Sequence, residues 1–173
     1  MATQTFGYKP GTLARGAGEL VTGMTRVTYL GKTTQPLWVK RGGLRMGKNQ
    51  AATAWAEPVL YAGASATSGP SDLISRTATL ALTVTMTNDR ATGANYEADV
   101  QASVLVPANT HLYGGGWSSS GDVNFGQDLT GALMWTNNGS GGAPDDPVVA
   151  DNVSNQGNMD TWWIFETNTT PNQ

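Results

Sequence analysis

The chain has 173 residues, a formal net charge of −3 and only 13% charged residues. Its 22 glycines, 6 tryptophans and few charges are unlike a coiled coil, a helical bundle rich in Glu and Lys, or a charge-swollen disordered chain. The length and the 39% share of hydrophobic residues suit one domain with one core. The absence of cysteine excludes disulfides, thiolate catalysis and cysteine-based metal sites.

The first 18 residues show no strand-like alternation and contain five glycines and prolines. We therefore expect residues 1–18 to form an extended arm that becomes ordered by docking on a neighbouring subunit. Residues 1–5 lack the basic region and apolar run of a signal peptide, and no apolar stretch has the length of a membrane-spanning helix. These features predict a protein made in a cytoplasm, with no membrane partner.

The next part of the chain holds short strand candidates bounded by glycine or proline. They lie at 25–30, 37–40, 44–46, 52–55 and 59–61. Gly42-Gly43 is interpreted as a tight turn between the second and the third of them.

Alternation with a period of two is clearest at 77–87, where every second residue is Leu, Val or Met and the others are Thr or Ala. This pattern is typical of a strand with one solvent-facing side. Turn residues at 88–93 and a second alternating run at 99–106, ended by Pro107, predict an antiparallel hairpin.

Further strand candidates lie at 111–113, 122–125, 132–135 and 162–165. The spacing of about 8–15 residues between candidates is typical of an all-β sandwich or barrel. We expect the sandwich to occupy residues 19–166, with a polar tail at 167–173. The loop at 137–158 is long for a compact domain, and indicates a binding loop, an excursion packed on a neighbour, or a disordered flap.

Catalytic and metal-binding motifs are scarce. His111 is the only histidine and lies in a strand-like context, no Gly-x-Ser-x-Gly elbow occurs, and Gly114-Gly115-Gly116 lacks the Lys of a nucleotide loop. Paired carboxylates of a glycan hydrolase remain an alternative, since spacing alone does not show which acids face each other. We expect a non-enzymatic protein with no catalytic residue, no metal and no cofactor.

Charge is divided unevenly along the chain. All ten basic residues lie at or before Arg90, and nine of the thirteen acidic residues lie after it. The division indicates a basic surface that docks on an acidic partner or on another copy, unless strands of the two halves interleave. The low pI of about 4.9 and the lack of a reader motif argue against nucleic acid. The candidate docking residues are Lys9, Arg15, Arg26, Lys40, Arg41, Arg45 and Lys48.

Tryptophans next to Gly, Asn and Asp are the best candidates for a binding site. Aromatic faces pack on sugar rings while carboxylates and amides bind the hydroxyls, and the same residues suit a subunit interface. Core packing is the alternative for each of them. Trp162 and Trp163 are adjacent, so we expect one in the core and the other exposed or at an interface. The candidate residues are Trp117, Asp122, Asp128, Trp135, Trp162 and Trp163.

Several short motifs resemble jelly-roll modules of bacteriophage virion proteins. They are the strand 77–87, GANY (93–96), the strand 99–106, PANTHLYGGGWSSSGD (107–122), VNFGQD (123–128) with the residues that follow to 135, and the Gly- and Pro-containing segment 54–70. The resemblance spans roughly residues 20–136. It implies a jelly-roll β-sandwich in a capsid-decoration, minor tail or fibre protein, commonly trimeric and without shared catalytic residues.

Together, these observations predict an all-β, jelly-roll-like antiparallel sandwich with an extended N-terminal arm. The expected function is that of an accessory virion structural protein, assembled in the host cytoplasm and bound to major capsid or tail proteins as a homotrimer. The alternative is a carbohydrate-binding module or adhesin that recognises host glycans through its loop Trp and Asp residues.

Overall fold

Strands make up nearly all regular structure in the computed structural model, which describes residues 2–8, 17–20, 22–49, 54–86, 92–120, 122–128, 132–139, 142–146, 150–155 and 157–167. The larger sheet contains β1 (Thr3–Gly7), β2 (Ala17–Leu20), β4 (Leu37–Lys48), β8 (Ala94–Asp99), β9 (Leu105–Val106), β11 (Val123–Asp128), β14 (Asn158–Met159) and β15 (Thr161–Thr167). The smaller sheet contains β3 (Thr25–Lys32), β5 (Ala54–Gly63), β6 (Leu73–Arg76), β7 (Leu80–Leu82), β10 (His111–Ser120), β12 (Met134–Asn137) and β13 (Asn152–Ser154).

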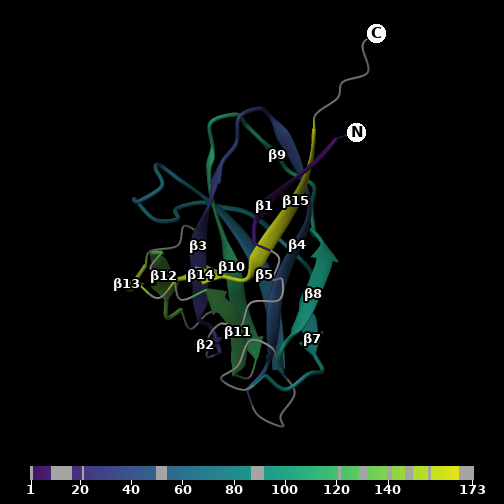
Figure 1. Cartoon of the computed structure of the whole chain (residues 1–173), viewed down its shortest axis with the longest axis vertical. Helices are drawn as coiled ribbons and strands as arrows, with labels where there is room; N and C mark the ends of the chain where they lie inside the picture. Colours follow the sequence, from purple (N-terminus) through teal and green to yellow (C-terminus); the bar gives the residue numbers. More distant parts are fainter. Residues whose placement is uncertain are drawn as a thin grey trace.

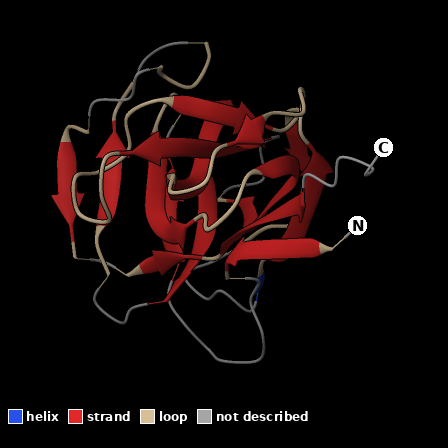
Figure 2. Cartoon of the chain, turned by 90° about the horizontal axis from the view of Figure 1, so that it is seen from above, coloured by secondary structure: helices blue, strands red, loops and turns tan. Residues whose placement is uncertain are grey.

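The prediction of an all-β antiparallel sandwich is confirmed, as the two views in Figures 1 and 2 show. All pairs of these strands are antiparallel. Within the described ranges, no helix is long and apolar enough to cross a membrane.

The order of strands in both sheets is that of a jelly roll. In the larger sheet β15 lies between β1 and β4, and β8 and β9 pair with the other edge of β4. In the smaller sheet β10 lies between β3 and β5, and β6 and β7 follow on the far side of β5. Strands from the two halves of the chain are therefore neighbours in both sheets. The chain between β10 and β15 contributes further strands to both sheets. β11 joins the larger sheet, and β12 and β13 join the smaller sheet.

The hairpin predicted from 77–87 and 99–106 is wrong. β7 pairs with β5 in the smaller sheet, whereas β8 and β9 pair with β4 in the larger sheet. Alternation identifies a strand with one buried face, but it does not select the partner strand. Leu82 and Val106 are both buried as the pattern predicts, although they belong to opposite sheets.

The turn predicted at Gly42-Gly43 is also wrong, because β4 continues through both glycines. A Cβ atom on Gly42 would lie 2.7 Å from Cη2 of Trp163, and one on Gly43 would overlap the ring of Trp162. From the smaller sheet, a Cβ atom on Gly114 would lie 2.8 Å from Nε1 of Trp163. The glycines therefore make room for indole rings, and Trp163 fills the space between the sheets where β4 and β10 have no side chain.

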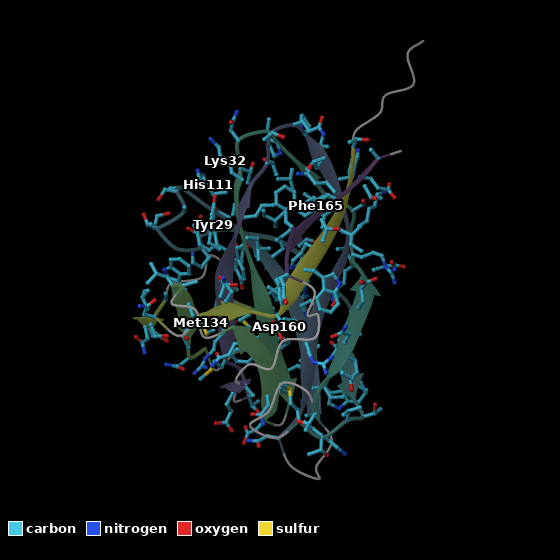
Figure 3. All side chains as sticks on the ribbon, viewed as in Figure 1. Tyr29, Lys32, His111, Met134, Asp160 and Phe165 are labelled. Atoms are coloured by element: carbon cyan, nitrogen blue, oxygen red, sulfur yellow. The ribbon has the colours of Figure 1, made fainter. Side chains whose placement is uncertain are left out.

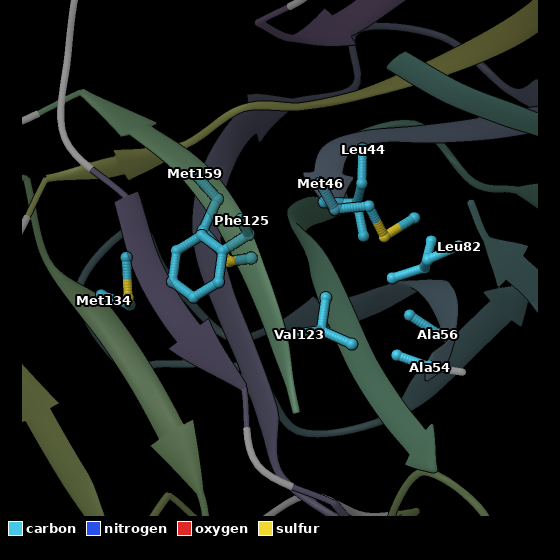
Figure 4. Packing of buried hydrophobic residues seen from close by; sticks show 9 residues of the cluster. All are labelled: Leu44, Met46, Ala54, Ala56, Leu82, Val123, Phe125, Met134 and Met159. Carbon is cyan, nitrogen blue, oxygen red and sulfur yellow. The ribbon is translucent and has the colours of Figure 1, made fainter. Parts of the chain in front are cut away.

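Two hydrophobic clusters, each with residues from both sheets, form the core between the sheets. One contains Phe6, Leu37, Val39, Leu60, Val106, Leu112, Trp163 and Phe165. The other, drawn in Figure 4, contains Leu44, Met46, Ala54, Ala56, Leu82, Val123, Phe125, Met134 and Met159.

A third cluster lies on the outer face of the smaller sheet, because residues next to inward-facing Leu60 and Leu112 point outward. It contains Val27, Val59, Tyr61, Tyr113, Trp117 and Trp135. Tyr113 and Trp135 meet edge to face, with ring centroids 5.0 Å apart. Four aromatic residues outside the inner core are therefore buried within the same chain.

Loops of the chain itself cover this outer cluster. The hydroxyl of Tyr113 donates to the carbonyl of Ser65, and that of Tyr61 donates to the carbonyl of Asp145 at 3.0 Å. The carboxylate of Asp146 accepts the backbone N–H of Leu73 at 2.9 Å. Burial in the cluster raises the pKa of both tyrosines above the usual value. The described part of the 137–158 loop thus packs on its own sheet.

The expectation that residues 1–18 lack strand structure is wrong for β1 and β2. β1 pairs with β15 from Thr3 opposite Glu166 to Gly7 opposite Trp162. Phe6 is 7% exposed and packs edge to face on Phe165, with centroids 5.1 Å apart. A five-residue strand is too short to show in the sequence pattern, but it pairs with one edge of β15 and buries one aromatic ring. Docking by residues 9–16 stays a prediction outside the described residues.

Candidate functional site

The four tryptophans selected from the sequence are buried. Their exposed fractions are 3% for Trp117, 4% for Trp135, 1% for Trp162 and 0% for Trp163. Trp163 lies between the sheets, and Trp117 and Trp135 lie in the outer cluster. The expectation that these indoles offer an open face to a sugar is therefore wrong, as is the expectation that one of the adjacent pair is exposed or available at an interface. Both members of that pair are buried because glycines leave room for their rings: Gly42 and Gly114 lie against Trp163, and Gly43 lies against Trp162.

Trp162 has a carboxylate partner that sequence reasoning did not select. Its indole Nε1 donates to Oε2 of Glu97 at 2.6 Å, across the strand that carries Gly43. The second oxygen, Oε1 of Glu97, lies 2.7 Å from the Arg41 guanidinium. Asp122 instead uses its backbone carbonyl to accept the N–H of Asn49. Asp128 is the last residue of β11, and its side chain lies outside the described set.

The candidate basic residues on β4 are engaged with the chain's own acidic half. Lys40 pairs with Glu166 at 3.4 Å, and Arg41 pairs with both Glu97 and Asp99. These ion pairs favour the interleaved-strand explanation of the uneven charge, since β4 is flanked by β8 and β15 from the acidic half.

The other basic candidates are spread over β4, β3 and the part of the chain outside the described residues. Arg45 donates to Asn95 at 3.1 Å, and Lys48 ends β4. Arg26 lies on β3, with its guanidinium carbon 5.7 Å from the ring centroid of Phe125, and burial lowers its pKa. Lys9 and Arg15 fall outside the described residues.

His111 forms a hydrogen bond of 3.0 Å between its Nδ1 and the hydroxyl of Tyr29. It lies opposite Lys32 on β3, and Figure 3 shows these three residues at one side of the sandwich. Ser118 follows seven residues later on the same strand, which is about 23 Å at the usual rise per residue. The serines of that strand are therefore too far from His111 to form a nucleophile–base pair with it.

Other acidic residues serve as hydrogen-bond or ion-pair partners within the fold. Glu57 is buried and accepts the hydroxyl of Thr79 at 2.5 Å, with Arg76 3.4 Å away. Asp151 accepts the backbone N–H of Asn138 at 2.7 Å, as an anchor within its loop. In the part of the chain that the structure describes, no three His, Asp or Glu residues come together as a metal site would require.

A groove of about 230 Å³ opens at the flank of the sandwich between β1, β3 and β14. β12 pairs with β3 only as far as Thr28, so no described strand pairs with that edge of β3 from Tyr29 to Lys32. None of the lining side chains carries a charge. They are Gly7, Tyr8, Thr28, Tyr29, Leu30, Asn158 and Met159.

Two exposed aromatic residues were missed by sequence reasoning. Tyr8, at the rim of the groove, is 42% exposed, and Trp55 on β5 is 39% exposed. For Trp55 a signal existed, because Ala54 and Ala56 on either side are buried and alternation places Trp55 on the opposite face. Tyr8 follows a strand that the sequence pattern did not reveal, so it had no comparable signal.

No protein-family model matches this sequence, and a search of curated proteins finds no match either. The functional interpretation therefore rests on the fold and on the residues described above.

Proposed function

We propose that this chain is a non-enzymatic structural protein of a bacteriophage particle, an accessory capsid-decoration, minor tail or fibre component on the particle surface. The observation that carries the proposal is the jelly-roll strand order. This fold is typical of viral capsid domains, lectin domains and cupins. Among the functions that this fold supports, a metal-dependent enzyme fits least well, because the chain has one histidine and no cysteine to bind a metal. The link from fold to function is an analogy, which the motif resemblance supports independently.

The motifs that resemble virion proteins build the sandwich itself. Residues 107–110 form a turn whose Asn109 adopts a positive φ of 66°. Thr33, directly after β3, holds this turn, because its hydroxyl donates to the carbonyl of Pro107 at 2.7 Å and accepts the N–H of Thr110 at 2.9 Å. β10, which follows directly, carries Gly114 against Trp163. The resemblance therefore concerns residues that define the fold, as expected for a shared structural module.

The proposed assembly is a homotrimer joined through the β12–β13 edge of the smaller sheet. Exposed edge strands invite pairing with another chain. Here the edge pair carries Val153 opposite Trp135, and Leu133 lies directly before β12. Both Leu133 and Val153 are exposed. An apolar pair on an open edge supports contact with a second copy.

Sedimentation tests the assembly directly. The wild-type protein should sediment as a trimer at micromolar concentration, and Leu133→Ser with Val153→Ser should yield a folded monomer. Leu105→Ser is the matched control, since Leu105 has similar exposure on β9 of the other sheet. A wild-type monomer, or a trimer that survives the double change, would contradict this interface. The particle role is tested separately by the protein composition of purified virions.

The carbohydrate-binding alternative no longer has the tryptophans on which it was based. A specific observation still favours it, namely the uncharged groove beside Tyr8. A particle component can also bind a glycan, so the two functions are compatible.

A further inference from the structure

We propose that the pair Asn138-Gly139 is a site of spontaneous deamidation, which places a new carboxylate beside the subunit contact proposed above. The sequence contains a single Asn-Gly pair, and it directly follows the last residue of β12. The chemical step depends only on this chain, whereas its effect on assembly rests on the proposed function. The two are therefore tested separately.

Deamidation requires that the carboxamide of an asparagine meet the backbone nitrogen of the next residue. The nitrogen of Gly139 attacks Cγ of Asn138, a five-membered succinimide forms, and the carboxamide nitrogen departs as ammonia with the proton from Gly139. Water then opens the ring at either carbonyl, so the residue becomes aspartate or isoaspartate without any oxidation or reduction. Glycine favours the attack because it has no Cβ atom to obstruct the approach.

The structure leaves the carboxamide of Asn138 accessible for this reaction. Asn138 is exposed, and its carboxamide forms no hydrogen bond with the described part of the chain. Its backbone N–H donates to Oδ2 of Asp151 at 2.7 Å, which holds the backbone at the end of β12. Asn124 shows the opposite case, since it is buried and its amide donates to the carbonyl of Met86 at 2.6 Å.

The side chain of Asn137 restrains the attacking nitrogen. Its Oδ1 accepts the N–H of Gly139 at 2.8 Å. The nitrogen has to turn toward Cγ of Asn138 and give up this proton, so the hydrogen bond must break first. The site is therefore accessible but restrained, and deamidation is slower in the folded protein than in an unfolded chain of the same sequence.

The product adds negative charge where two carboxylates already lie. Oδ2 of Asp145 would lie 2.8 Å from a Cβ atom on Gly139, and Asp151 accepts the N–H of Asn138. Within the described ranges, neither aspartate forms an ion pair with a basic side chain. Like charges at such short range repel each other. Deamidation therefore loosens this loop, whose Asp145 carbonyl accepts the hydroxyl of Tyr61, and the β12–β13 edge beside it.

The chemical step is tested by incubating the purified full chain for weeks in warm, mildly alkaline buffer, followed by peptide mass spectrometry and an isoaspartyl methyltransferase assay. We expect isoaspartate at Asn138. Asn152 is the matched control, because it is equally exposed but precedes the β-branched Val153. Asn137→Ala should raise the rate several-fold. Asn137→Ser should raise it less, because a serine hydroxyl makes the same bond more weakly.

The effect on the loop is tested with Asn138→Asp, which supplies the product charge, against Asn138→Gln, which keeps a neutral amide. Asn138→Asp should speed the hydrogen exchange of the amides of Asn138 and Gly139, whose acceptors lie in this loop. In sedimentation, Asn138→Asp should also shift the trimer toward the monomer, whereas Asn138→Gln should sediment as the wild type does.

The proposal is overturned if Asn138 stays unmodified while the urea-unfolded chain deamidates there, or if Asn152 is modified as fast as Asn138. An unchanged rate in Asn137→Ala would refute the restraint by Asn137, and unchanged hydrogen exchange in Asn138→Asp would refute the loosening of the loop. A monomeric wild type that still deamidates at Asn138 contradicts the proposed trimer alone and supports this site.

Discussion

The contact between Trp163 and the glycines of the two sheets makes the position of Gly114 sensitive to a single added methyl group. A Cβ atom at this position would lie 2.6 Å from Cδ1 of Leu30 and 2.8 Å from Nε1 of Trp163. Leu30 is only partly buried, but Trp163 is fully buried between the sheets, so its indole ring does not yield easily. Overpacking of this kind costs about 1–3 kcal/mol, partly offset by about 0.4–1 kcal/mol from the reduced freedom of the unfolded chain.

Gly114→Ala should therefore lower the free energy of unfolding by about 1–2 kcal/mol, as the balance of those two effects. For a chain of this size the melting temperature should fall by about 2–8 °C. The assay is urea unfolding followed by circular dichroism, with the midpoint and the slope fitted together.

Gly142→Ala is the matched control, because a Cβ atom at Gly142 has no neighbour within 4 Å. It should leave stability unchanged or raise it slightly. Gly114→Ala should lower the free energy of unfolding less in a Trp163→Phe background than in the wild type, because the smaller ring leaves space for the methyl group. If Gly114→Ala proves as stable as Gly142→Ala, the indole of Trp163 does not occupy the space beside β10, and this account of the core is incorrect.

Three further predictions follow from burial and charge. Phe6→Ala should cost about 3–5 kcal/mol in chemical unfolding because it empties a core position, whereas a solvent-exposed arm at β1 would lose almost nothing. The raised pKa of Tyr61 keeps its phenol neutral in the folded state, so the stability it contributes is present below about pH 10 and is lost as the pH rises further. In urea titrations, Tyr61→Phe should therefore flatten the decline of stability above about pH 10, and an unchanged decline would contradict the assignment. Glu166→Gln breaks the partly exposed ion pair with Lys40 and should cost less than about 1 kcal/mol; a larger loss would mean that this pair is not screened by solvent.

The sequence predicted the fold class because alternation and turn residues are local signals. The buried side of the run at 80–86 was identified correctly, with Leu82 and Met86 in the interior. Local signals do not determine which strands pair. β7 and β8 follow each other closely in the chain but join opposite sheets. Glycines were misread for a related reason. The pair Gly42-Gly43 was interpreted as a turn. In the structure it lies within a strand, and the lack of side chains at both positions lets two tryptophan rings pack on the backbone.

The candidate site was predicted less well than the fold. Exposure of a tryptophan depends on what covers it, and the loops over Trp135 come from distant parts of the chain, such as Gly69 against its indole. The uneven charge had two explanations, and only the strand order could favour one, by placing Arg41 between acidic strands. The groove combines residues from three strands that are far apart in the sequence, so no local sequence motif could predict it.

The protein composition of purified virus particles tests the central claim most directly. Particles of the virus that encodes the chain, purified by density gradient and analysed by quantitative mass spectrometry, should contain it at a fixed copy number per particle that is a multiple of three. Particles purified to constant composition that lack the chain, while infected cells contain it, would contradict the proposed role as a virion structural protein.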